Sequence, residues 1–302
     1  MDITTGVNAF QAPLLNDWTS RELYGEGGWG CGKTYLLWEF ILSRSAANPA
    51  QCQCIVVTLT GPLMKSVILV EMDLAFRRLF LTPQHNKSEG LVTWTPEGRR
   101  IWLRTAEHPE RLEGPTLAIS ATDESAQTDE EVYTRLSSRT RDGSATILQR
   151  LYVGRPEGTR TWFNKHIQEI KRGVRIDGHH VRGTTMDNER NLAHGYVDDL
   201  KLITAGDERM IRQVIHGEAA EDSGTIFGEI PEENVKACER AELGHIVLGA
   251  DFNRGHHVWV VGTWYELSET LHIWGEYVTV DEAFAEHRNH PGVKRVGPEG
   301  AL

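Results

Sequence analysis

The sequence predicts an α/β fold in which a mainly parallel sheet carries helices on both faces. Three observations support this. Runs rich in β-branched residues alternate with amphipathic runs from residue 21 to residue 217. A glycine-rich turn joins the first such strand to the first such helix. After residue 244 the pattern becomes wholly β. Alternating strands and helices are typical of parallel sheets, because parallel neighbours need crossover connections.

The elements of the first part can be read in chain order. Strands are predicted at 21–24, 54–59, 117–120 and 145–153, with a hairpin formed by 91–95 and 100–105. Helices are predicted at 34–43, 63–80, 161–171, 193–204 and 207–217, and another opens with a capping-box spacing at 128–131. In the helix over 63–80, the apolar positions are Val67, Leu69, Val70, Leu74 and Leu79.

Length and composition predict two domains. The chain has 302 residues, of which 39% are hydrophobic and 25% charged, as in ordinary soluble proteins. We expect one domain over 1–217, an acidic linker over 218–243 and the start of a second domain over 244–302. The linker is expected because eight acidic residues lie between Glu218 and Glu242 against two basic ones. The second domain should open with strands at 245–252, 258–265 and 271–278, then a helix over 281–288.

Charge and cysteine content exclude several classes of protein. No apolar run approaches the roughly 18 residues that a membrane span needs, and no signal peptide is apparent. Four irregularly spaced cysteines form neither a disulfide framework nor a zinc motif and suit a reducing cytosol. A net charge of −11 argues against a protein that coats nucleic acid, although arginine clusters such as 77–78 and 99–100 leave room for a local DNA-tracking surface.

The glycine-rich turn fits the phosphate-loop pattern G-x-x-x-x-G-K-[S/T]. Its residues are Gly27, Gly28, Trp29, Gly30, Cys31, Gly32, Lys33 and Thr34. Glycines allow successive backbone N–H groups to surround phosphates, while the lysine reaches the β- and γ-phosphates and the threonine hydroxyl binds Mg²⁺. A helix that begins at the loop adds its positive end. We therefore expect a P-loop ATP site, with Lys33 catalytic and exposed in the loop.

A second pair of candidate residues ends the strand over 117–120. Asp123 and Glu124 lie roughly 90 residues after Lys33. In phosphate-loop ATPases a carboxylate at this place holds Mg²⁺, and a second one orients the attacking water. Adjacent carboxylates also occur at helix starts, because their negative charge interacts favourably with the positive end of the helix dipole. Together with Lys33, the first interpretation predicts Asp123 as a metal ligand and Glu124 as catalytic.

The order and spacing of these motifs resemble the large terminase subunit of tailed bacteriophages, the motor that packages DNA into a procapsid. The similarity runs over most of the chain. Besides the loop, it rests on the segments 111–117, 123–126, 154–158, 162–166, 184–188, 196–200 and 211–218. One departure is Trp29, because the family often has arginine at that position, so a charge role there is vacant.

The resemblance implies an ATPase domain followed by an RNase H-like nuclease domain. It implies double-stranded DNA, the portal protein of the procapsid and a small terminase subunit as partners. It also implies a homo-oligomeric ring and the cytoplasm of an infected or lysogenic bacterium as location. Gly154 begins the segment that resembles the family's coupling motif, which senses the γ-phosphate. An arginine that stabilises the transition state is expected among Arg135, Arg139 and Arg141, with Arg139 as the candidate, in its own or a neighbouring subunit.

The nuclease expectation rests on carboxylates near strand ends. Two-metal cleavage needs acidic ligands on neighbouring strands for Mg²⁺ or Mn²⁺. Asp251 is the candidate for the first ligand and Glu299 for the second, with Glu276 as its competitor. A third ligand should follow well downstream, yet the chain stops at Leu302, so the nuclease domain is expected to be incomplete.

The predicted function is an ATP-hydrolysing motor of viral double-stranded DNA packaging, with a metal-dependent endonuclease domain. Two alternatives remain. A helicase-like ATPase is disfavoured because no second phosphate-loop-like lobe follows. A non-catalytic prophage relic that binds DNA or the portal is favoured somewhat by Trp29 and by the early stop.

Overall fold

The computed structural model describes residues 6–219 except 96, and residues 245–280 except 254–255 and 266–269. These residues fall into two compact units, one on each side of residues 220–244. The predicted linker, the predicted helix over 281–288 and Glu299 lie largely or wholly outside the described residues. No helix in the described part is long and apolar enough to cross a membrane.

The first unit is a three-layer α/β/α arrangement around an eight-stranded sheet. The strand order is β3-β4-β5-β2-β6-β7-β1-β8. Within this order, the six neighbouring strands β5, β2, β6, β7, β1 and β8 run parallel to one another. The strands are β1 (Glu22–Gly27), β2 (Gln53–Thr58), β3 (Gln84–Asn86), β4 (Leu91–Trp94), β5 (Arg99–Thr105), β6 (Ile119–Thr122), β7 (Gln149–Gly154) and β8 (Gly178–Gly183). The predicted mainly parallel sheet is confirmed, and β4 and β5 form the predicted antiparallel hairpin.

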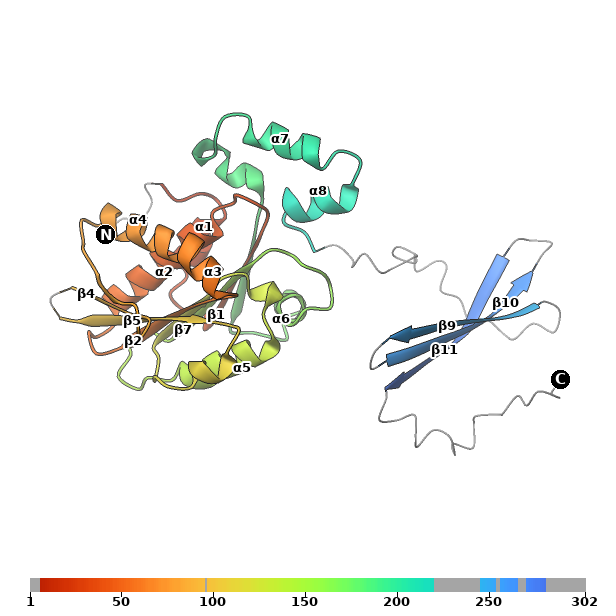
Figure 1. The fold of residues 1–302 in the computed structure, drawn as a ribbon, viewed down its shortest axis with the longest axis horizontal. Helices are drawn as coiled ribbons and strands as arrows, with labels where there is room; N and C mark the ends of the chain where they lie inside the picture. The colour runs from red at the N-terminus through yellow and green to blue at the C-terminus, as the bar shows by residue number, and fades with distance from the viewer. Residues whose placement is uncertain (1–5, 96, 220–244, 254–255, 266–269, 281–302) are drawn as a thin grey trace. The chain divides into compact units, whose positions relative to one another are not determined.

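Helices cover both faces of this sheet (Figure 1). One face carries α1 (Gln11–Asn16), α2 (Lys33–Ala47), α3 (Gly61–Leu63) and α4 (Leu69–Arg78); the other carries α5 (Glu130–Arg139) and α6 (Trp162–Lys171). The helices α7 (Tyr196–Ile203) and α8 (Glu208–Val214) form a small group of their own. Strand residues alternate between the two layers. In β2, Cys54 and Val56 join the core with α2, whereas Ile55 and Val57 join the core with α5 and α6.

The helix predicted over 63–80 is present, and Leu69 and Leu79 pack against the core, whereas three of its other apolar positions are exposed. A π-helical turn, Met64–Ile68, joins α3 to α4, so the segment is helical from residue 61 to residue 78. The buried positions are Ile68, Met72, Ala75 and Phe76, while Val67, Val70 and Leu74 are 37%, 53% and 44% exposed. The extra residue of a π turn rotates the side chains that follow it, which a strict 3.6-residue period does not anticipate.

Two other predictions are corrected locally. The N-cap of α5 is Asp129, whose carboxylate accepts the Glu131 N–H at 3.0 Å. Thr128, the predicted cap, donates its hydroxyl to the Ser125 carbonyl at 2.9 Å and so stabilises the preceding turn instead. The strands β3 and β8 were not predicted, because the segments 84–86 and 178–183 are short and polar. In β8, pairing with β1 outweighs the weak strand propensity.

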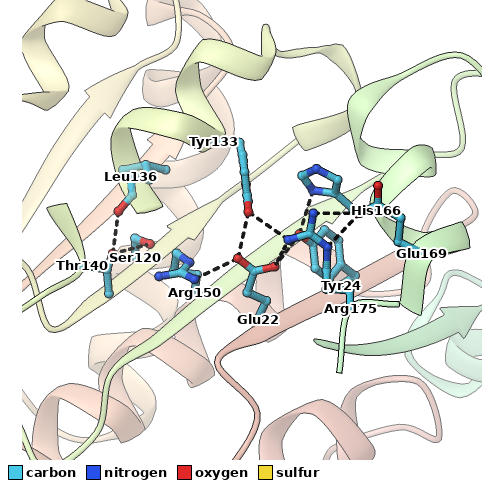
Figure 2. A network of polar contacts seen from close by, with 10 residues as sticks. All are labelled: Glu22, Tyr24, Ser120, Tyr133, Leu136, Thr140, Arg150, His166, Glu169 and Arg175. Carbon is cyan, nitrogen blue, oxygen red and sulfur yellow. Dashed lines mark hydrogen bonds and ion pairs between the residues drawn. The ribbon is translucent and has the colours of Figure 1, made fainter. Parts of the chain in front are cut away.

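A polar cluster lies at the amino-terminal end of β1 and β7, on the face covered by α5 and α6 (Figure 2). The buried Glu22 carboxylate accepts hydrogen bonds from four donors on different elements. They are the hydroxyls of Tyr24 and Tyr133, each at 3.1 Å, and the guanidinium groups of Arg150 at 2.8 Å and Arg175 at 2.7 Å. Burial raises the pKa of Glu22, but the two arginines outweigh burial and hold it below the ordinary value of 4.5.

The second unit contains an antiparallel sheet in the order β11-β10-β9. Its strands are β9 (His245–Asn253), β10 (His256–Tyr265) and β11 (Thr270–Val280). The three predicted strands of the meander are confirmed. Asp251 lies in β9 opposite Val258, and Glu276 lies in β11 opposite Val260.

Candidate nucleotide-binding site

The phosphate loop joins β1 to α2 at the carboxyl end of the parallel strands. All six residues of β1 are buried, which fixes the start of the loop. Gly30 and Gly32 have φ values of 69° and 92°, in the left-handed region that favours glycine, and Gly32 is the N-cap of α2. The Lys33 ammonium donates to the carbonyls of Gly27 at 3.0 Å and Gly28 at 2.8 Å. Lys33 is therefore only 9% exposed, which corrects the expectation of an exposed lysine.

Four side chains from outside the loop bind its backbone carbonyls. Thr185 donates to Trp29 O at 2.8 Å, Asn188 to Gly30 O at 2.7 Å, Asn8 to Cys31 O at 2.9 Å and Gln11 to Gly32 O at 2.9 Å. A peptide C=O and the following N–H point in opposite directions. Drawing the carbonyls outward therefore turns the following N–H groups inward, as an anion site requires. These four hydrogen bonds, called the brace of the loop below, were not predicted from the sequence.

The last residue of α8, Val214, contacts the backbone of the loop. The Trp29 N–H donates to the Val214 carbonyl at 2.8 Å. A Cβ atom at Gly28 would lie 2.3 Å from the same carbonyl, so only glycine permits this approach. The α7–α8 group is thereby attached to the loop through backbone contacts.

Asp123 follows β6 and lies beside the start of α2. Its Oδ2 accepts a hydrogen bond from the Thr34 hydroxyl at 3.4 Å, so two residues predicted as metal ligands meet. The carboxyl group is buried, and its Oδ1 has no hydrogen-bond partner among the described residues. Burial and the neighbouring Glu124 charge raise the pKa of Asp123 to about 7, partly offset by Lys33. An unsatisfied carboxylate oxygen next to a hydroxyl fits a hard divalent cation such as Mg²⁺.

Glu124 is held in an unusual backbone conformation. Its φ is 50°, in the left-handed region, which is uncommon for a residue other than glycine and is often found at functional sites. The Glu124 Oε2 lies 3.6 Å from the Nε of Arg155. Gly154 permits this pairing, because a Cβ there would lie 3.1 Å from the backbone nitrogens of Ser125 and Ala126. The predicted coupling segment thus passes directly beside Glu124.

A cavity of about 700 Å³ opens over these groups. Residues of the loop and the start of α2 form one part of its lining. The π-helical turn, α4, the turn that bears Glu124, the coupling segment and the segment that ends at the start of α7 form the rest. The lining residues are Trp29, Gly30, Gly32, Lys33, Thr34, Tyr35, Ser66, Val67, Val70, Glu71, Glu124, Arg155, Asn188 and Tyr196. Sequence reasoning identified the loop and Glu124 but missed Arg155 and the wall from α4.

The predicted arginines do not reach this cavity. The Arg139 carbonyl accepts the N–H of Leu117, which precedes β6 at the end of the sheet opposite Asp123. Arg135 is paired with Glu113 and Glu131. Arg139 does not line the cavity in the described residues, and its catalytic role, in its own or a neighbouring subunit, stays a prediction.

Comparison with known proteins identifies the family. Residues 25–232 match the family model described as terminase large subunit, T4likevirus-type, N-terminal. The match covers more than half of the chain, so the chain belongs to the terminase large subunit family of phage DNA-packaging proteins. Among curated proteins no relative matched.

Solved structures share the fold. The large terminase of a thermophilic bacteriophage, in complex with ADP, superposes with a TM-score of 0.61 at 15% identity, covering 93% of this chain and 69% of that one. The ATPase domain of the large terminase of Thermus phage P74-26 gives 0.53 at 17% identity, covering 71% of this chain and 94% of that one. The large terminase of bacteriophage HK97 gives 0.55 at 10% identity, covering 93% and 65%.

Proposed function

We propose that this chain hydrolyses ATP and uses the energy to move double-stranded DNA into a viral procapsid. The supporting observation is the convergence of Lys33, Thr34, Asp123 and Glu124 on one site from two segments roughly 90 residues apart. The terminase of the thermophilic bacteriophage was solved with ADP and with ATP-γ-S, which is consistent with a nucleotide as ligand.

Each of these residues has a distinct role in the proposed reaction. The oxygen of a water molecule forms a bond to the γ-phosphorus while the bond from that phosphorus to the bridging oxygen of ADP breaks. Glu124 orients the water and accepts its proton, and ADP and inorganic phosphate are released. Lys33 neutralises charge on the transferred group, and the inward N–H groups of the loop position the phosphates.

Thr34 and Asp123 are the residues that would hold Mg²⁺. The ion supplies charge neutralisation for the phosphate oxygens. The unpartnered Asp123 Oδ1 is the observation on which this assignment depends.

The direct test is an ATPase assay of the purified full chain with and without double-stranded DNA. The motor hypothesis predicts hydrolysis that rises when DNA is added and is lost in Lys33→Ala. A protein that binds DNA but shows no hydrolysis above that of Lys33→Ala would support the relic alternative instead.

A second assay separates a packaging motor from a helicase-like ATPase. Procapsids that carry the portal protein, supplied with the small terminase subunit, should protect DNA from nuclease only when the chain and ATP are present. Strand separation without protection would favour the helicase alternative. We propose a homo-oligomeric ring as the working form and residues 1–217 as its ATPase domain.

The second unit is proposed to begin an RNase H-like nuclease domain. Asp251 lies in an edge strand of the antiparallel sheet, and Glu276 lies in the opposite edge strand with β10 between them. Asp251 remains the candidate for the first metal ligand, with Glu276 or Glu299 as the second. Manganese-dependent nicking of a plasmid that is lost in Asp251→Asn would support this assignment.

A further inference from the structure

Arg155 lines the cavity and is paired with carboxylates from two segments. Its guanidinium lies between two carboxylates, with Nε 3.6 Å from Glu124 and Nη2 2.8 Å from Glu157. The same group lies 6.0 Å from the centroid of the Trp29 ring. The side chain is 33% exposed and lines the cavity directly. Arg155 therefore contacts a residue of the proposed hydrolysis step and lies near the phosphate loop.

The cations around the cavity are few and differ in freedom. Among the described residues that line it, Lys33 and Arg155 are the only cations. Lys33 is buried and bonded to two loop carbonyls, so Arg155 is the more exposed charge. A guanidinium is suited to phosphate because its planar fork donates two parallel hydrogen bonds. The flat face of the Trp29 indole can hold such a group nearby through a cation–π contact of this length.

We propose that Arg155 supplies, from the coupling segment, the second positive charge of the site, and that it binds the terminal phosphate of ATP. This inference rests on the proposed ATPase function. In the arrangement seen here, Arg155 pairs with Glu124 and Glu157. When it turns to the γ-phosphate, Glu124 is released to receive the proton of the attacking water. The exchange is feasible because these ion pairs are partly exposed and hence weak.

The geometry makes the exchange specific for the triphosphate. Arg155 follows Gly154, which is fixed against the turn that bears Glu124. A cation placed at this turn faces the γ-phosphate end of a nucleotide whose β-phosphate lies in the loop. ADP lacks the group that Arg155 would bind.

The experiment compares ATP-γ-S and ADP binding with hydrolysis in Arg155→Ala, Arg155→Lys and a matched control, Arg160→Ala. Arg160 is an exposed arginine of the same segment and lies outside the cavity lining. In Arg155→Ala we expect the affinity for ATP-γ-S to fall about 10-fold and kcat by about 10³-fold, the lower end of the effect of arginines that stabilise the transferred phosphate. ADP affinity should stay unchanged. Arg155→Lys should recover part of the loss, and Arg160→Ala should behave as wild type.

A rescue variant tests whether a guanidinium from the loop side can take over this role. Trp29 lines the same cavity, so Trp29→Arg combined with Arg155→Ala restores a guanidinium there and should recover ATP-γ-S affinity. Equal losses for ATP-γ-S and ADP in Arg155→Ala, or no loss for either, would overturn the proposal, as would a rescue variant no better than Arg155→Ala. A wild-type chain that binds ATP-γ-S without hydrolysing ATP would refute the proposed function, while the comparison of the two nucleotides would still decide the role of Arg155.

Discussion

Buried carboxylates at the two ends of the same sheet have opposite environments. At the amino-terminal end, Glu22 accepts bonds from two hydroxyls and two guanidinium groups (Figure 2). At the carboxyl end, Asp123 Oδ1 has no hydrogen-bond partner in the described part of the chain, and the Asp123 pKa is raised rather than lowered. A satisfied carboxylate stabilises the fold, whereas an unsatisfied one costs stability and is expected where a ligand completes its coordination.

The largest effect should come from removing the loop lysine. Lys33→Ala should reduce ATP hydrolysis at least about 10³-fold, because the transferred phosphate loses a principal source of positive charge. The unfolding free energy should change little, since Lys33 bonds only to two loop carbonyls and a weakly interacting Cys31 sulfur. Steady-state phosphate release measures the first quantity and urea denaturation the second. The exposed Lys65→Ala is the control, and wild-type turnover in Lys33→Ala would refute the assignment of the site.

The opposite end of the sheet should show the reverse pattern. Glu22→Ala should lower the unfolding free energy by about 3 kcal/mol, because two partly buried guanidinium groups lose their shared partner. Hydrolysis per folded molecule should be close to that of wild type, since Glu22 lies about 16 Å along β1 from the loop. Glu131→Ala, which breaks an exposed ion pair with Arg135, should cost much less, because exposed ion pairs contribute little to stability. Equal losses of stability in the two variants would remove the contrast.

The two site carboxylates should separate binding from hydrolysis. Glu124→Gln should bind Mg-ATP as wild type does and hydrolyse it about 10²-fold more slowly, the usual scale for losing a general base. Asp123→Asn should weaken magnesium-dependent binding. It should not lower the unfolding free energy, because it removes a buried negative charge whose Oδ1 atom has no hydrogen-bond partner among the described residues. Filter binding at varied Mg²⁺ concentration distinguishes the variants. The same loss of binding in both would show that the roles are wrongly divided.

The sequence predicts those parts of the site that depend on local pattern. The glycine spacing of the loop and the position of Asp123 after a strand are local features, and the structure brings them together. The brace around the loop depends on tertiary packing instead. Asn8 and Asn188 bond to each other at 3.1 Å although 180 residues separate them, and no local pattern encodes such a pairing.

Elements of the fold divide in the same way. The N-cap of α6 is Thr161, at which the sequence predicted the helix to start. Its hydroxyl accepts the Asn164 N–H at 3.2 Å, and an N-cap is a local signal. The strand β8 is a strand because β1 lies beside it, and its sequence of glycine and histidine gives no such indication. Arg155 was missed because its role depends on Glu124 and Trp29, which come from other segments.

The smallest expected effect is the contribution of the Glu22 cluster to the dependence of stability on pH. Because the Tyr24 hydroxyl donates to Glu22, His166 Nδ1–H donates to the Tyr24 oxygen at 3.0 Å, and burial together with the Arg175 charge lowers the pKa of His166 below 6.5. The unfolded chain therefore binds a proton first as pH falls, and stability is lost below about pH 6.5. Glu22 has a lowered pKa, so its contribution is present above about pH 4.5 and is lost below it.

The cluster should therefore contribute two successive losses of stability on acidification, each measured as the difference between wild type and a variant. Urea denaturation at pH 7, 5.5 and 4 measures them. His166→Gln should reduce the loss between pH 7 and 5.5, and Glu22→Gln the loss between pH 5.5 and 4. The exposed His108→Gln should leave both intact. If His166→Gln and His108→Gln gave the same profile as wild type, the cluster would not be the source of the first loss, and the contrast between the two ends of the sheet would rest on Glu22 alone.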